Sequence, residues 1–256
     1  MVEQKRALGY PYRNSERYLY RFDQFCTIGF PHIETITPEI GNAWAVIRPD
    51  ENSRTFENRV APVRELARFM NRMGIDAYII PIELPPKRRR PHTPHIFSEQ
   101  ELNLFFKAAD SIVPTNRARL RHLQIPVFFR MMYTCGLRPQ EVRLIQREYL
   151  DLQERTIFIP ESKGHKDRMV VMSPEMARIC SRYYAYAKQE FPDSPYLFPC
   201  QQKGGIAYAP SWVFDSFHMC LERSGIEKVP GNAPRPYDFR HPNVKPKTYR
   251  LSLIAA

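Results

Sequence analysis

Apolar residues in the first third of the chain recur at the spacing of amphipathic helices. Residues 15–28 carry one such face, residues 55–74 carry a second that Gly74 can end, and a shorter helix is expected over residues 37–47. The apolar positions of the two longer helices are Leu19, Phe22, Phe25 and Ile28, and Phe56, Val60, Val63, Ala67 and Met70. This pattern predicts a small helical bundle.

Four arginines fall elsewhere on the helix predicted over residues 55–74, namely Arg59, Arg64, Arg68 and Arg72. A basic helix face can contact phosphate, and it can equally be a solvated surface. The pattern alone leaves both interpretations open.

A second helical region opens with a capping-box pattern, in which Ser98 is followed three residues later by Glu101. A long helix is then expected from Asn116 to Cys135, and Gly136 can terminate it. The order of these signals indicates a new domain that begins near residue 97.

Strand patterns appear only in the middle of this second region. A helix is expected from Pro139, and residues 155–173 then hold two β-rich runs around a polar turn, which predicts a hairpin. Helices return over residues 174–190 and 211–225. The predicted fold class is mainly α with a small β-sheet.

A proline-rich basic segment separates the two regions. Four consecutive cations lie among prolines, and no acidic residue occurs between Glu83 and Glu99; the cations are Lys87, Arg88, Arg89 and Arg90. Proline removes amide donors and fixes φ, so an extended linker is expected. The chain therefore divides into a helical domain at 1–83, a linker at 84–96 and a second domain at 97–256.

The excess of positive over negative charge lies entirely in the second part of the chain. The net charge is +11; residues 1–83 hold 11 basic and 11 acidic residues, whereas residues 84–256 hold 27 and 16. Such a balance favours a polyanionic partner, although a basic protein without a nucleic-acid role fits the charge as well.

Other signals narrow the class of protein. The five cysteines are widely spaced without a C-x-x-C pair, which indicates free thiols rather than disulfides or a zinc ribbon. His218 and Cys220 lack further metal ligands, and no phosphate-binding loop is present. No stretch approaches the roughly 18 apolar residues of a membrane helix. We expect a cytoplasmic protein with no membrane contact, no cofactor and no metal.

Three clusters carry candidate chemistry. In the first, YTCGLRPQEVRLI, Arg138 stands between a helix-breaking glycine and a new helix, where nearby amides also suit an anion, and Glu141 can orient it. In the second, SKGHKDR, the hairpin turn holds Lys163, Lys166 and Arg168, and a lysine held near other cations can donate a proton.

The third cluster is PYDFRH at the start of an expected helix. Tyr237 and Arg240 lie three residues apart and would share a face, Asp238 can cap or buttress the helix, and His241 follows.

Taken in order, the three clusters resemble the tyrosine recombinase (phage integrase) family. The likeness runs from about residue 12 to His241. It implies a SAM-like helical core-binding domain before the linker and a tyrosine-recombinase catalytic domain after it. CGLRPQEVRLI is similar to the box of the first catalytic arginine, SKGHKDR to the hairpin of the catalytic lysine, and PYDFRH to the box of the second arginine.

The resemblance implies roles for these residues. Arg138, Lys163, Tyr237 and Arg240 would be catalytic, and Glu141, Asp238 and His241 would support them. Double-stranded DNA would be the partner, with contacts from the linker cations and from Lys166 and Arg168. A homo-oligomer or an intact recombinase could accompany the chain on DNA.

The chain departs from the family pattern at two places. Tyr237 stands where the family usually has histidine; a phenol can donate to a phosphate oxygen but is a poor base. The family's nucleophilic tyrosine lies some three dozen residues beyond the second arginine, whereas sixteen residues follow Arg240 here, with two prolines close together. Tyr249 is not expected to be the nucleophile, and the tail is interpreted as a truncated or out-of-frame end.

The resemblance therefore predicts a protein that binds DNA and positions a scissile phosphate, with strand exchange through a 3′-phosphotyrosyl intermediate lost or impaired. The alternative is a non-catalytic DNA-binding regulator or decoy that occupies recombination sites. A metal-dependent nuclease is a third interpretation, and it would require added Mg²⁺.

Overall fold

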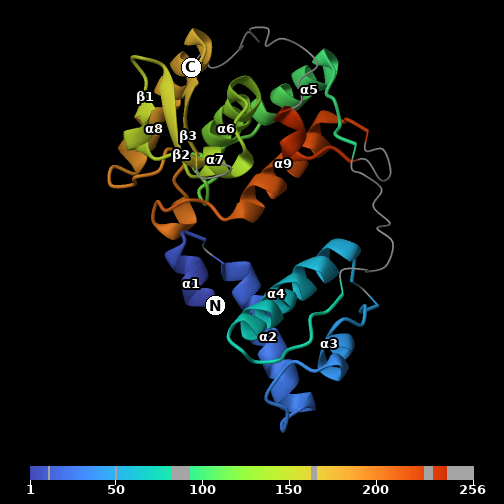
Figure 1. The fold of residues 1–256 in the computed structure, drawn as a ribbon. Helices are drawn as coiled ribbons and strands as arrows, with labels where there is room; N and C mark the ends of the chain where they lie inside the picture. The colour runs from blue at the N-terminus through green and yellow to red at the C-terminus, as the bar shows by residue number, and fades with distance from the viewer. Residues whose placement is uncertain (11, 50, 82–92, 163–165, 228–232, 241–256) are drawn as a thin grey trace. The chain divides into compact units, whose positions relative to one another are not determined.

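A computed structural model of the chain describes residues 1–10, 12–49, 51–81, 93–162, 166–227 and 233–240 (Figure 1). The chain forms two compact units, Met1–Pro91 and His92–Ala256. No helix within the described ranges is long and apolar enough to cross a membrane.

The first unit is helical, as its apolar pattern predicts. Its core is built mainly where α2 (Arg13–Gly29) packs against α4 (Ser53–Arg72). The buried side chains include Phe22, Trp44, Phe56, Val60 and Val63. Asn52 and Thr37 cap two of the helices by accepting hydrogen bonds from main-chain amides. A short first helix was not predicted. The helices are α1 (Val2–Ala7), α2 (Arg13–Gly29), α3 (Pro38–Trp44) and α4 (Ser53–Arg72).

The prediction that Arg59 lies on a basic surface of α4 is wrong, because Arg59 is buried with 2% of its surface exposed. Its Nε and Nη2 donate to Glu51 at 2.8 and 2.6 Å, and its guanidinium lies 5.0 Å from the ring centroid of Trp44. The Arg59 hydrogen bonds lower the pKa of Glu51. Arg59 is thus part of the core of the first unit, whereas Arg68 and Arg72 are exposed as predicted.

The second unit combines helices with a small sheet that lies at its edge (Figure 1). Its helices are α5 (Glu99–Asp110), α6 (Arg121–Cys135), α7 (Pro139–Arg143), α8 (Pro174–Glu190) and α9 (Pro210–Ser224), and its 3₁₀ turns are η1 (Arg147–Tyr149), η2 (Gln201–Lys203) and η3 (Pro236–Arg240). The strands are β1 (Leu150–Asp151), β2 (Thr156–Ser162) and β3 (Lys166–Val171), in the antiparallel order β1-β2-β3. The hairpin is confirmed, and β1 was not predicted.

The long helix α6 begins at Arg121, five residues later than the pattern predicts. Residues before it form turns that η2 holds in place: the Gln202 side chain donates to the Arg117 carbonyl at 3.0 Å, and the Gln201 side chain accepts from the Arg119 amide at 2.8 Å. These partners lie more than 80 residues away in the sequence. No local pattern contains that information.

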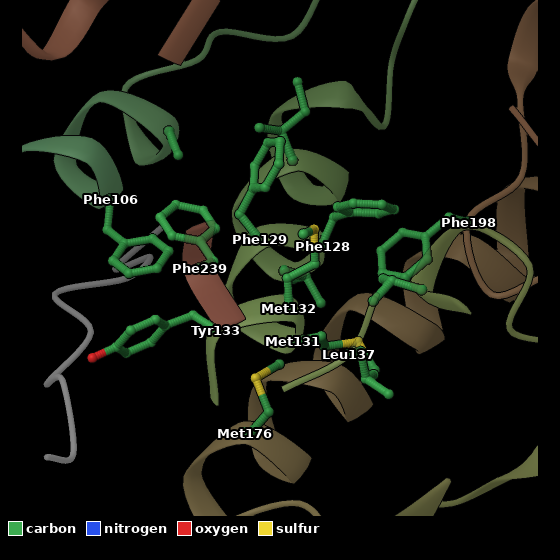
Figure 2. Packing of buried hydrophobic residues seen from close by; sticks show 14 of the residues in the cluster. Phe106, Phe128, Phe129, Met131, Met132, Tyr133, Leu137, Met176, Phe198 and Phe239 are labelled. Carbon is green, nitrogen blue, oxygen red and sulfur yellow. The ribbon is translucent and has the colours of Figure 1, made fainter. Parts of the chain in front are cut away.

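The core of the second unit is aromatic and joins α5, α6, α9 and η3. Phe239 of η3 is 1% exposed, and its ring centroid lies 5.0 Å from Phe105, 6.1 Å from Phe129 and 5.5 Å from Phe217. Figure 2 shows Phe239 between Phe106 and Phe129. The 3₁₀ turn that precedes Arg240 is therefore fixed to the main core by its own phenylalanine.

Candidate functional site

Arg138 lies at the junction between α6 and α7. Gly136 ends α6 in the left-handed conformation, with φ of +61°, and Pro139 occupies the first position of α7. Arg138 is the extended N-cap residue between them, and its side chain is 24% exposed. The Arg138 guanidinium therefore extends from a turn that is fixed to the core by the buried side chain of Leu137.

Glu141 folds back from α7 onto Arg138. Its two carboxylate oxygens accept from the Arg138 amide at 2.7 Å and from the Arg138 guanidinium at 2.6 Å. This is the carboxylate half of a capping box: Glu141 accepts from the N-cap amide of Arg138 and at the same time orients the Arg138 guanidinium. Glu141 is the acidic companion of Arg138, as predicted from its spacing.

Arg168 reaches the same carboxylate from strand β3. Its Nη1 and Nη2 donate to the two oxygens of Glu141, each at 2.7 Å, in a bidentate pair. Burial alone would raise the pKa of Glu141, but the hydrogen bonds from Arg168 and from Arg138 lower the pKa to about 2. Glu141 is therefore ionised at any physiological pH and is shared by two arginines.

Arg240 enters the site from η3. Its Nε donates to the main-chain carbonyl of Gly136 at 2.9 Å. Burial and then the positive charge of Arg138 and, more weakly, of Arg168 lower the pKa of the Arg240 guanidinium. An arginine remains protonated despite such a shift.

The box around Arg240 is held by Asp238. The Asp238 carboxylate is 3% exposed and accepts from the Arg235 amide at 2.7 Å, so it caps the turn as predicted. Tyr237 is 44% exposed on the same 3₁₀ turn, three residues before Arg240. The expected helix is a 3₁₀ turn over the residues that the structure describes.

The hairpin that leads to SKGHKDR is irregular just before its turn. The register of β2 and β3 shifts between Ile159 and Ser162, and Glu161 has φ of +45°. The Glu161 amide donates to the Asp167 carboxylate at 2.9 Å across this bulge. Bulges of this kind re-aim the chain next to functional sites.

A cavity of about 880 Å³ opens beside Arg138 and Glu141, between α7 and β2. Its lining combines polar groups with partly exposed aromatic rings; it includes Gln140, Gln146, Tyr149, Phe158, Glu161 and Tyr196. The charged pair thus faces open space on one side, where an anion can approach.

Several predicted site residues fall outside the described residues: Lys163, His241, Tyr249 and the linker cations Lys87, Arg88, Arg89 and Arg90. Lys166 is exposed at the start of β3. Of the predicted catalytic set, Arg240 bonds to the Gly136 carbonyl two residues before Arg138, and Glu141 bonds to both Arg138 and Arg168. The Gly136 carbonyl was missed, and a main-chain acceptor leaves no signal in sequence beyond the glycine itself.

These features define a protein with a cluster of arginines around one carboxylate, built on a mainly helical unit with a three-stranded sheet. The model of the phage integrase family matches residues 96–243, so the chain belongs to the phage integrase family. The predicted resemblance and fold class are confirmed.

Curated relatives agree with this assignment. The chain is 26% identical over 246 residues to the putative integrase/recombinase y4rB of Sinorhizobium fredii, covering 94% of this chain and 77% of that protein. It is 27% identical over 201 residues to the tyrosine recombinase XerD of Neisseria meningitidis, covering 77% of this chain and 64% of that one. The chain thus spans less than two thirds of XerD.

Solved structures share the fold. The Tn1549 transposon integrase, in complex with transposon right end DNA, superposes with a TM-score of 0.63 at 14% identity and covers 94% of this chain and 82% of its own. The XerH site-specific recombinase, bound to palindromic difH substrate in a post-cleavage complex, gives 0.61 at 17% identity and covers 88% and 64%.

Proposed function

We propose that this chain binds double-stranded DNA and holds one backbone phosphate against Arg138 and Arg240. The observation that carries the proposal is that Arg240 of η3 donates to the carbonyl of Gly136, two residues before Arg138 at the α6–α7 junction. Guanidinium suits this task because its planar fork donates to two phosphate oxygens and stays charged. The complexes of the relatives with DNA support the choice of ligand.

The site is arranged for transfer at phosphorus. In the family's reaction a tyrosine oxygen attacks the phosphorus, the bond to the 5′ oxygen breaks, and a proton passes to that oxygen. Arg138 and Arg240 would neutralise the non-bridging oxygens as charge builds up, Tyr237 would donate to one of them, and Lys163 would protonate the leaving oxygen. The new phosphotyrosyl bond retains the energy for rejoining.

We propose further that this chain alone does not complete strand cleavage. The sequence that follows Arg240 places prolines at positions 242 and 246 and supplies one tyrosine, Tyr249. Incubation with a nicked suicide duplex, analysed on a denaturing gel, should yield no covalent adduct. An adduct that disappears in Tyr249→Phe would overturn this part of the proposal and leave the DNA-binding part intact.

The DNA-binding part is tested by titrating a 30-base-pair duplex and following fluorescence anisotropy across a series of salt concentrations. Arg138→Lys and Arg240→Lys keep the charge but lose the planar fork, and each should weaken binding about 10- to 100-fold, in the range of a lost charged hydrogen bond. Arg178→Gln, on the exposed side of α8, is the control and should bind within about 2-fold of the original chain. Equal affinity in all four proteins would refute the site.

The second candidate is a non-catalytic regulator that occupies recombination sites, and the proline-interrupted sequence after Arg240 favours it. A competition assay with an intact recombinase tests this candidate. A regulator should inhibit cleavage by the intact enzyme in proportion to its own DNA affinity, whereas an unrelated DNA-binding activity should leave cleavage at the enzyme's site unchanged.

A further inference from the structure

Arg168 joins strand β3 to helix α7. It extends from β3, where it pairs with Ile159 of β2, and it binds the carboxylate of Glu141 on α7. Glu141 in turn binds both the amide and the guanidinium of Arg138. The result is a continuous chain of charged hydrogen bonds from the hairpin, through one carboxylate, to the first arginine of the phosphate site.

The geometry of Arg168 is that of a carboxylate clamp. Both of its terminal nitrogens donate to Glu141 at 2.7 Å, which is the full fork-to-fork arrangement. Hydrogen bonding to Glu141 also raises the pKa of Arg168, although burial opposes this. The side chain is 31% exposed and Glu141 is 10% exposed, so the pair is shielded from water on the carboxylate side.

We propose that Arg168 is a positioning residue: it fixes strands β2 and β3 to α7 through Glu141, and so holds these strands in place beside Arg138. The proposal rests on the proposed function, because it assigns a role in the same phosphate site. It differs from a phosphate contact by Arg168, which the charge of SKGHKDR alone would suggest.

The need for such a clamp follows from the hairpin itself. Its ladder is interrupted between Ile159 and Ser162, so strand pairing alone holds the end of β2 weakly against β3. The clamp binds β3 on the far side of this interruption, opposite Ile159. A lysine at position 168 would present a point charge and could not span both carboxylate oxygens.

The experiment is a double-mutant cycle in the full chain, with the 30-base-pair duplex as probe. The variants are Arg168→Gln, Glu141→Gln, both together, and Arg178→Gln as a control for the loss of one charge. We expect Arg168→Gln to weaken binding at least 5-fold more than the control does. In the Glu141→Gln background the same substitution should cost no more than the control, because the link is already cut.

Hydrogen exchange of the free protein supplies the second measurement. Arg168→Gln should speed exchange in residues 156–162, 166–171 and 139–144, while α8 at 174–190 stays as protected as in the original chain. Arg168→Lys should give an intermediate result in both measurements. An equal loss of affinity in both backgrounds would assign Arg168 to phosphate contact, and unchanged exchange in the hairpin would also overturn the proposal.

The two proposals fail in different ways. If the original chain does not bind the duplex, the proposed function is wrong, yet the exchange measurement still decides whether Arg168 holds the hairpin. If the duplex binds through Arg138 and Arg240 but the cycle shows no coupling, only the clamp is refuted.

Discussion

The Nε of Arg240 donates to the carbonyl of Gly136 at 2.9 Å, and this bond joins residues 104 positions apart. Gly136 also precedes Arg138 by two residues, in the left-handed turn that ends α6. The turn at Gly136 therefore sets the direction in which the chain leads to Arg138, and its carbonyl accepts the hydrogen bond from Arg240. In the proposed phosphate site, a main-chain carbonyl thus holds the second arginine, and the Glu141 carboxylate holds the first.

Replacing Gly136 with alanine should disturb both arginines. A Cβ at this position would meet nothing within 4 Å, so the cost comes from φ of +61° alone, about 1–2 kcal/mol. Urea unfolding should show that loss, and duplex affinity should fall with it. Gly29→Ala, which has equal space and no positive φ, should leave both quantities nearly unchanged. A Gly136→Ala chain as stable as the original would contradict this account of the turn.

The stability of the second unit should depend on pH through Glu141. Its pKa is about 2 in the folded chain and 4.5 as the ordinary value, so ionised Glu141 contributes about 3 kcal/mol above pH 4.5. Because the folded pKa is depressed, that contribution is lost as the pH falls from 4.5 towards 2. Unfolding free energies of the original chain and of Glu141→Gln should therefore converge over that window.

Glu154→Gln provides the control for the pH series, because Glu154 is exposed in the turn between β1 and β2. Its unfolding free energy should follow that of the original chain at every pH. A constant gap between the original chain and Glu141→Gln down to pH 2 would mean that the carboxylate is not held as the structure has it.

Phe239→Ala should destabilise the second unit by about 3–5 kcal/mol, the usual cost of removing a fully buried phenylalanine. It should also weaken duplex binding, because Arg240 follows directly on the displaced residue. Phe214→Ala, at a phenylalanine that is 42% exposed, is the matched control and should change the midpoint of thermal unfolding little. Loss of stability without any loss of affinity would separate the anchor from the site.

The linker cations should contribute to affinity by neutralising backbone phosphates. Substituting Lys87, Arg88, Arg89 and Arg90 with glutamine should reduce the slope of log affinity against log salt by roughly 0.9 for each phosphate that is no longer neutralised. The measurement is the anisotropy titration repeated between low and physiological salt. A slope identical to that of the original chain would show that the linker does not bind the backbone.

Breaking the buried pair in the first unit should be costly. Arg59→Met leaves the Glu51 carboxylate, 4% exposed, without its partner, and about 3–5 kcal/mol is expected. Arg59→Met combined with Glu51→Gln should recover part of the loss. Exposed Arg68→Gln should stay within about 0.5 kcal/mol of the original chain. Hydrogen exchange in α2 and α4 would report these changes for the first unit separately.

Local signals in the sequence explain much of this fold. The capping box of Ser98 and Glu101, the glycine at 136 and the proline at 139 each act over a few residues, so each predicts a helix boundary that the structure confirms. Arg138 and Glu141 could be paired for the same reason, because three residues separate them on one turn.

What could not be predicted depends on distant partners. Arg59 has the spacing of a surface residue, and only Trp44 and Glu51 make its burial favourable. Residues 116–120 continue a helical pattern, but side chains of η2 hold them as turns. In the sequence, Arg168 has the pattern of a solvent-exposed cation in a hairpin. Its bidentate pair with Glu141 depends on the tertiary position of β3 relative to α7.

Phe239 and Arg240 are neighbours in sequence with opposite destinations, one in the aromatic core and the other at the Gly136 carbonyl. A shift of the segment 236–240 by one residue would put a guanidinium where the Phe239 ring now lies in the core. It would also remove Arg240 from the Gly136 carbonyl. Substitutions within this box can thus be gradual in effect. Insertions or deletions there should abolish the site outright, and natural variation in length among relatives should avoid these five positions.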